Sequence, residues 1–185
     1  MSAPVVRDGA RAKAARILLL LLDVDGVLTD GKIVYDTDGR EIKAFHVRDG
    51  HGIKMLQQAG VEVGIVTGRR SAIVEARARE LGMALVCQGV SDKRATWRGV
   101  LQEKHLTPAQ TAYVGDDILD VPLLRAVGFA AAVGDAEACV AQAADYVAGR
   151  PGGNGAVREI AEFILRARGA WDAVTAELLA PRDDS

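Results

Sequence analysis

Cysteine is scarce in this sequence, with only Cys87 and Cys139 among 185 residues. Both lie in apolar surroundings, and neither has a second cysteine at the short spacing typical of a zinc site. Two cysteines are also too few for the dense disulfide framework of a small secreted domain. We therefore expect buried, reduced thiols and a cytoplasmic protein.

Long apolar runs are also missing. The longest, at residues 17–22, is far too short to cross a bilayer. Asp23 and Asp25 follow it, where a signal peptide would carry a small-residue cleavage site. The run predicts a buried strand, and we expect no membrane partner.

A surplus of charge of one sign is absent as well. Lys and Arg total 23 against 25 Asp and Glu, a formal net charge of -2. A general nucleic-acid-binding surface would be strongly basic, so we expect no nucleic-acid partner. A small anionic substrate is still allowed, because a local cationic pocket can lie on a nearly neutral protein.

Short apolar runs alternate with segments of helical spacing from residue 17 onward, which predicts a parallel sheet with helical crossovers. The predicted strands are residues 17–22, 61–66, 84–86, 111–114 and 129–133, and the predicted helices are 52–59, 71–81, 92–105, 118–127 and 136–143. The expected fold is α/β, a doubly wound Rossmann-like sheet. A Gly-rich loop and an amphipathic helix follow over residues 153–168.

One segment breaks this alternation. Residues 30–49 contain two short alternating runs around Asp38-Gly39, which predicts a small β-hairpin inserted after the first strand. It is too short to form a large cap domain. We expect a flexible N-terminal tail over 1–15, a single domain over 16–170 and a C-terminal tail over 171–185.

Polar residues follow three of the predicted strands. Asp23 and Asp25 follow the first strand, Thr67 follows residues 61–66, and Asp116 with Asp117 follows residues 111–114. The carboxyl ends of parallel strands meet at one edge of a sheet, so these side chains should converge. Lys93 opens the helix that begins on the same side.

Converging carboxylates repel one another and need a cation. Oxygen ligands without cysteine or histidine favour a hard ion such as Mg²⁺, which also accepts phosphate oxygens. We expect Asp23, Asp25 and Asp116 as its ligands. Asp117 and Asp120 would orient bound water and Lys93.

Each catalytic residue then has an expected role in phosphate ester hydrolysis. Asp23 attacks phosphorus and forms an aspartyl-phosphate. Asp25 protonates the leaving alcohol and then deprotonates the attacking water. Thr67 and Lys93 bind the phosphoryl oxygens. Each motif alone could be a turn or a helix cap, but their order at successive strand ends favours the functional interpretation.

These residues resemble the haloacid dehalogenase superfamily of phosphohydrolases. The motifs are Asp23-Val24-Asp25-Gly26, Thr67-Gly68-Arg69, Lys93 and Gly115-Asp116-Asp117-Ile118-Leu119-Asp120. Three further segments, at residues 28–31, 45–54 and 152–159, look like those of the 3-deoxy-D-manno-octulosonate 8-phosphate (KDO 8-P) phosphatases. That family is uncapped, tetrameric and acts in lipopolysaccharide precursor synthesis.

The resemblance implies a sugar-acid phosphate as substrate, and a homotetramer in which neighbouring subunits close each site. The substrate contacts that it implies are His46, Val47, Arg48, Asp49, Gly50, Lys54, Arg69, Arg77 and Lys93. Two positions depart from the family pattern: Asn154 stands where Arg is frequent, and His46 where Asn is frequent.

Three other interpretations stay open at this point. The substrate could be another nonulosonate phosphate, such as a sialic-acid-type 9-phosphate. A phosphoacceptor signalling domain also uses an Asp, a Thr or Ser and a Lys, although its motifs occur in a different order. A catalytically idle scaffold is disfavoured because no essential motif residue is missing.

Overall fold

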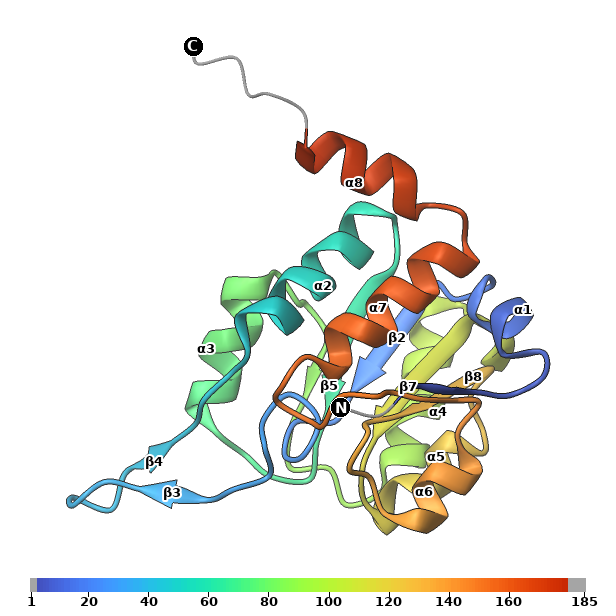
Figure 1. Ribbon diagram of the computed structural model, residues 1–185. Helices are drawn as coiled ribbons and strands as arrows, with labels where there is room; N and C mark the ends of the chain where they lie inside the picture. Colours follow the sequence, from blue (N-terminus) through green and yellow to red (C-terminus); the bar gives the residue numbers. More distant parts are fainter. Residues whose placement is uncertain (1–2, 180–185) are drawn as a thin grey trace.

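The computed structural model describes residues 3–179 as one α/β layer structure (Figure 1). Its seven-stranded sheet has the order β1-β9-β8-β7-β2-β5-β6, and a separate two-stranded sheet joins β3 to β4. The strands are β1 Val5–Val6, β2 Leu19–Leu22, β3 Val34–Tyr35, β4 Glu41–Ile42, β5 Glu62–Val66, β6 Val86–Cys87, β7 Thr111–Gly115, β8 Phe129–Ala132 and β9 Tyr146–Val147. All neighbours in the large sheet are parallel except β1 and β9.

Helices cover both faces of this sheet, as the doubly wound prediction requires. They are α1 Ala10–Ala14, α2 Val47–Gln58, α3 Ala72–Leu81, α4 Lys93–Lys104, α5 Val121–Leu124, α6 Ala138–Ala143, α7 Ala156–Ala167 and α8 Trp171–Leu179, with short 3₁₀ helices η1 Pro108–Gln110 and η2 Ile118–Asp120. Apolar residues of α1, α2, α3 and α7 form one core layer, and those of α4, α5 and α6 form the other. The predicted fold class is confirmed.

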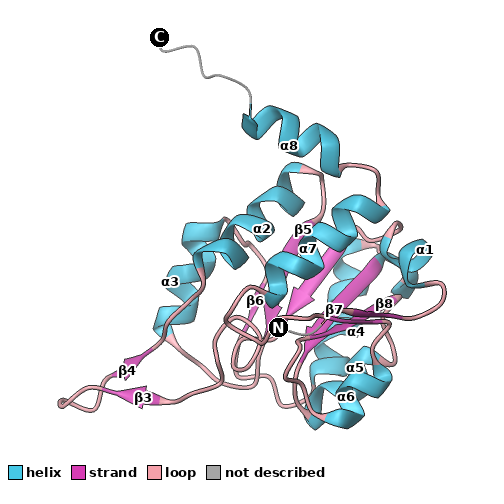
Figure 2. Cartoon of the chain, in the orientation of Figure 1, coloured by secondary structure: helices cyan, strands magenta, loops and turns pink. Residues whose placement is uncertain are grey.

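The β-hairpin predicted within residues 30–49 is present and projects away from the domain (Figure 2). It follows β2 and leads into α2. It exposes apolar side chains, including Tyr35 of β3 and Ile33 directly before that strand. Within residues 3–179, no second domain stands over the edge where β2, β5 and β7 end.

The two termini differ from the expected tails. Val5–Val6 pairs antiparallel with β9, and Ala10 and Ala14 of α1 are fully buried. Residues 171–179 form α8, whose Val174 packs against the core. Long-range contacts order these segments, and the local sequence pattern does not reveal such contacts. Residues 1–2 and 180–185, also in the expected tails, lie outside the described residues.

No helix within residues 3–179 combines the length and apolar character needed to cross a membrane.

Candidate active site

Asp23 lies directly after β2, at the edge where the central parallel strands end. Its backbone N–H donates to the carbonyl of Val114 on β7 (3.1 Å), and its Oδ1 accepts from the N–H of Val24 (2.7 Å). The other carboxylate oxygen, Oδ2, lies 2.8 Å from Nζ of Lys93. Burial raises the pKa of Asp23, and Lys93 opposes that rise. A buried carboxylate beside one fixed cation suits a nucleophile.

Lys93 is the first residue of α4, and Asp92 caps that helix by accepting from the N–H of Ala95 (2.9 Å). Its ammonium also lies 2.6 Å from Oδ1 of Asp120. Burial alone would lower the pKa of Lys93, but the carboxylates of Asp23 and Asp120 outweigh it and the pKa is raised. The two carboxylates therefore favour the charged form of Lys93.

Asp120 connects this lysine to the loop after β7. Its Oδ1 accepts from Lys93 and from the hydroxyl of Tyr113, and its Oδ2 accepts from the backbone N–H groups of Asp116 (3.0 Å) and Asp117 (3.3 Å). Asp120 is fully buried. With both oxygens used by these donors, its placement fits the predicted orienting role rather than direct metal ligation.

Tyr113 is a site residue that the sequence analysis missed. Its hydroxyl donates to Asp120 (2.6 Å) and accepts from Lys93 (3.0 Å). In the sequence it is one more apolar-flanked residue of strand β7, indistinguishable from a core tyrosine. Burial and the neighbouring carboxylates raise the pKa of Tyr113 well above its ordinary value, so the hydroxyl stays neutral.

Asp116 points into the same cluster. One carboxylate oxygen each from Asp23, Asp116 and Asp120 lie within 4.8 Å of one another. Oδ1 of Asp116 is buried and has no hydrogen-bond partner within residues 3–179. Burial and the charges of Asp23 and Asp120 raise its pKa to about 7. Unpartnered oxygen and crowded negative charge both fit a hard divalent cation.

Glycine at position 26 is required by this arrangement. Its φ is +84°, and a Cβ there would overlap the carboxylate of Asp116. The loop after β2 therefore passes directly against the loop after β7. The glycine of the Asp23–Gly26 motif has this steric reason in addition to its place in a turn.

Asp25 lies outside the three-carboxylate cluster. Its side chain pairs with the buried ammonium of Lys43 and lies 4.0 Å from Nε of Arg69. Glu41 lies 3.4 Å from Lys43 and 2.8 Å from Arg69, so the base of the hairpin reaches the site. The Asp25 carboxylate therefore does not join those of Asp23, Asp116 and Asp120, and its role as a metal ligand stays a prediction.

Lys43 and Glu41 were also missed by the sequence analysis. The signal that could have found them is the two-residue alternation of the hairpin strand, which places both on one face. The hydroxyl of Ser71 donates a hydrogen bond to Glu41, and this bond is the main cause of the lowered pKa of Glu41. The charges of Lys43 and Arg69 lower that pKa further. These charges surround Asp25 with two cations and one anion.

Thr67 and Asp117 occupy the predicted edge. Thr67 follows β5, which pairs with β2 so that Ile65 is level with Leu22, and its side chain is buried. Asp117 is exposed, and its Oδ1 accepts from the N–H of Leu119 (3.4 Å). Thr67 thus follows β5 at the same edge of the sheet where Asp23 follows β2, whereas Asp117 caps η2.

Two of the residues predicted to contact substrate lie beside the aspartates after β2. Lys93 pairs with Asp23, and Arg69 lies beside Asp25. Asp49 is buried in α2, and its carboxylate accepts from the backbone N–H groups of Gly155 (3.1 Å) and Arg158 (2.8 Å) at the start of α7. Its side chain thus joins two helices. This contact explains Asp49 without a substrate.

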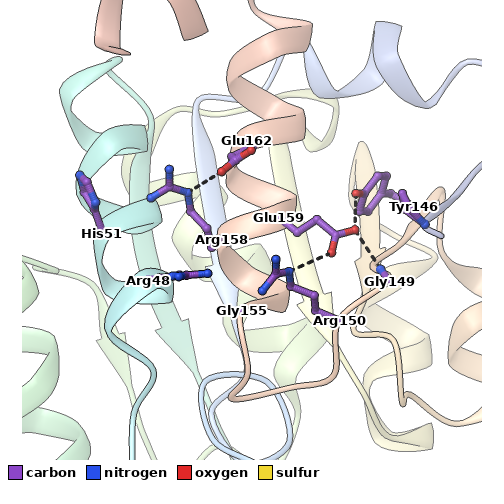
Figure 3. A pocket seen from close by; sticks show the side chains of 10 residues that line it. Arg48, His51, Tyr146, Gly149, Arg150, Gly155, Arg158, Glu159 and Glu162 are labelled. Atoms are coloured by element: carbon purple, nitrogen blue, oxygen red, sulfur yellow. Dashed lines mark hydrogen bonds and ion pairs between the residues drawn. The ribbon is translucent and has the colours of Figure 1, made fainter. Parts of the chain in front are cut away.

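Arg48 faces a separate cavity of about 700 Å³ between α2, α7 and the loop after β9 (Figure 3). Arg150 and Arg158 also line it, and Glu162 accepts from Arg158 (2.7 Å). Asp23 and Lys93 do not line this cavity. Arg48 therefore lines a hollow that contains three arginines and two glutamates, and it does not belong to the cluster around Asp23.

The remaining predicted contacts lie along the hairpin exit and α2–α3. His46 precedes α2 with a buried Nδ1 that has no partner within residues 3–179, and Val47 is 81% exposed. Gly50 packs against Arg77, which also pairs with Glu80 (2.8 Å). Lys54 is exposed farther along α2, close to Gly82. Within one chain these residues do not gather around Asp23.

Comparison with known proteins agrees with this geometry. A family model described as haloacid dehalogenase-like hydrolase matches residues 46–128. The KDO 8-P phosphatase KdsC of Escherichia coli (strain K12) is 45% identical over 161 residues, which cover 87% of this chain and 86% of the relative. That of Yersinia pestis is 43% identical over 170 residues, covering 92% and 91%.

Solved structures agree as well. The KDO 8-P phosphatase of Moraxella catarrhalis, in complex with magnesium, phosphate and KDO, has a TM-score of 0.90 and 40% identity, covering 92% of this chain and 98% of that one. The cobalt-bound enzyme of Haemophilus influenzae has a TM-score of 0.83 and 43% identity, covering 87% and 94%.

The fold and the cluster of acidic residues around Lys93 define a phosphatase of the haloacid dehalogenase-like class. Within that class, the chain belongs to the 3-deoxy-D-manno-octulosonate 8-phosphate phosphatase family. The resemblance noted in the sequence is thereby confirmed. Membership of a hydrolase family also argues against the phosphoacceptor and scaffold interpretations.

Proposed function

We propose that this chain hydrolyses 3-deoxy-D-manno-octulosonate 8-phosphate to the free sugar acid and inorganic phosphate. The observation that carries the proposal is the contact of Asp23 with Lys93, 2.8 Å apart, in a chain 45% identical to phosphatases named for that substrate. The product would enter lipopolysaccharide precursor synthesis. The predicted cytoplasmic location stays a prediction.

Asp23 is the nucleophile in this proposal. Its Oδ2 attacks phosphorus, the bond to the sugar oxygen breaks, and an aspartyl-phosphate forms. Lys93 stabilises the charge on the phosphoryl oxygens, and Thr67 donates its hydroxyl to them. Water then attacks the phosphorus, releasing phosphate and restoring the Asp23 carboxylate.

Asp25 moves the protons. It gives a proton to the departing sugar oxygen in the first step and takes one from the attacking water in the second. Its contacts with Lys43 and Arg69 hold the carboxylate beyond the end of β2, away from the three-carboxylate cluster. The hairpin base thus orients the acid–base group.

The proposed cofactor is Mg²⁺, held by the carboxylates of Asp23 and Asp116. When bound, it would reduce the electrostatic repulsion between a phosphate dianion and the carboxylates. The unpartnered Oδ1 of Asp116 supports this assignment, as does the magnesium ion in the Moraxella catarrhalis relative. Asp117 and Asp120 hold the surrounding loop, and Asp25 stays a predicted third ligand.

Substrate contacts beyond Arg69 would come from a neighbouring copy in the proposed homotetramer. His46, Val47, Arg48, Lys54 and Arg77 then stay predicted contacts, because they lie apart from Asp23 within one chain. An arginine-lined surface suits the carboxylate of a sugar acid through paired hydrogen bonds.

The test is phosphate release from the 8-phosphate beside a nonulosonate 9-phosphate and common sugar phosphates, with Mg²⁺ or a chelator. We expect a preference for the 8-phosphate that chelation removes. Asp23→Asn should lower kcat at least about a thousandfold, because the nucleophile is lost, whereas the exposed Asp172→Asn should match the unmodified chain. Preference for the 9-phosphate would show that the proposed substrate is wrong. Full activity of Asp23→Asn would overturn the proposed mechanism.

A further inference from the structure

Tyr113 lies on β7 directly beneath the catalytic lysine, and its side chain is fully buried. We infer that Tyr113 is a positioning residue that fixes the Lys93 ammonium against Asp23. This role rests on the proposed function, since it concerns the same site. Nothing in the motifs of the sequence singles out this tyrosine.

Three oxygen atoms lie around the ammonium group of Lys93. A lysine ammonium has three N–H donors and no acceptor. Oδ1 of Asp120 at 2.6 Å and the hydroxyl of Tyr113 at 3.0 Å accept hydrogen bonds from Lys93, and Oδ2 of Asp23 at 2.8 Å forms an ion pair with it. The two hydrogen bonds therefore fix the direction from which the ammonium faces Asp23.

Tyr113, Lys93 and Asp120 are joined to one another by three hydrogen bonds. Its hydroxyl accepts from Lys93 and donates to the same Asp120 oxygen that accepts from Lys93, at 2.6 Å. Such a closed network orders its members more strongly than separate pairs do. Without the hydroxyl, Lys93 would be held by two carboxylates only, and the buried Asp120 would compete with Asp23 for it.

The position of Lys93 matters because its charge acts on a group being transferred to Asp23. Fixed charges accelerate such a step only when they already lie where negative charge develops. A displacement of about 1 Å can cost a hundredfold in rate. Tyr113 touches Lys93 and not the reacting atoms, so its contribution is to placement alone.

The experiment compares Tyr113→Phe with the matched control Thr111→Val. Thr111 lies two residues earlier on β7, is equally buried, and its hydroxyl bonds Trp97 and Pro108 rather than Lys93. We expect Tyr113→Phe to lower kcat by about tenfold to a hundredfold with KM nearly unchanged. Thr111→Val should lower the melting temperature and leave kcat unchanged. Equal kcat values in the two variants would overturn the inference.

A second readout needs no turnover. The Lys93 ammonium resonance, identified by its loss in Lys93→Met, should exchange slowly with water in the unmodified chain and in Thr111→Val. It should broaden or vanish in Tyr113→Phe. If no sugar phosphate is hydrolysed, the proposed function fails while this signal still decides the role of Tyr113. An unchanged signal in Tyr113→Phe would show that Tyr113 only packs in the core and does not position Lys93.

Discussion

Asp116 is the residue whose charge depends most directly on whether a cation is bound. Burial and the charges of Asp23 and Asp120 raise its pKa from 3.8 to about 7. Folding without metal therefore favours the neutral carboxyl. The stability from this group is complete below pH 3.8 and is lost as the pH rises through about 7. A bound divalent cation reverses the preference, because it requires the carboxylate.

Magnesium affinity should therefore depend on pH in a defined direction. Below about pH 7, protons and Mg²⁺ compete for Asp116, so we expect affinity to fall by up to about tenfold for each pH unit. Calorimetric titration of Mg²⁺ at pH 8, 7 and 6 measures this. Asp116→Asn should bind weakly at every pH, and Asp172→Asn should follow the unmodified chain. Equal affinity at pH 6 and pH 8 would exclude Asp116 as a ligand.

Single residues also show where sequence reasoning ends. The placement of Asp23, Thr67, Lys93 and Asp116 could be predicted because each follows a strand or begins a helix. Tyr113 could not, because its apolar neighbours are those of any buried strand. The partner of a polar atom is a three-dimensional property, and no local spacing encodes it.

At the scale of elements, α2 and α7 are locked together through Asp49 and Gly52. Asp49 accepts two backbone N–H groups at the start of α7, and a Cβ at Gly52 would lie 3.0 Å from Cα of Arg158. The glycine loop ahead of α7 packs on the loop after β2, where the N–H of Gly153 donates to the carbonyl of Val27 (2.9 Å). Helix packing therefore supports the loop that carries Asp23.

Asp49→Ala should destabilise the chain without a direct effect on substrate affinity. It leaves two N–H groups at the start of α7 without their acceptor, which should lower the free energy of unfolding by about 2–4 kcal/mol. Asp92→Ala, which removes one exposed cap bond on α4, should cost about 1 kcal/mol. Denaturant unfolding measures both. A higher KM for Asp49→Ala with unchanged stability would instead support the substrate contact predicted from the sequence.

Elements with strong periodicity could be predicted well, and those set by packing could not. The five predicted strands of the sheet are present, with boundaries that differ by up to two residues. Helix α2 begins at Val47 rather than at residue 52, because Gly50 and Gly52 weaken the local helical signal where packing requires small residues. Strands β1 and β9 are too short to give a pattern, and their pairing orders them.

At the scale of the whole molecule, the hairpin combines two roles. Its base supplies Lys43 and Glu41 to the surroundings of Asp25. The hairpin, which projects from the domain, exposes Ile33 (56%), directly before β3, Tyr35 (59%) and Ile42 (49%). Exposed apolar side chains on a projecting element favour association with another surface, and exposed strand edges also need covering. Both features support the proposed homotetramer with hairpins packed together.

Charge on the hairpin should therefore dissociate the assembly and lower activity together. In the double variant Ile33→Asp and Ile42→Asp, unpaired carboxylates would be buried wherever copies meet, so we expect monomers. Sedimentation velocity measures the mass, and phosphate release on the same samples measures the catalytic cost. Loss of neighbouring subunits should raise KM if they supply substrate contacts.

Leu179→Asp, at an 83% exposed position on α8, is the control expected to stay assembled. Dissociation by Leu179→Asp alone would move the interface from the hairpin to α8, and a fully active monomer would show that each chain closes its own site.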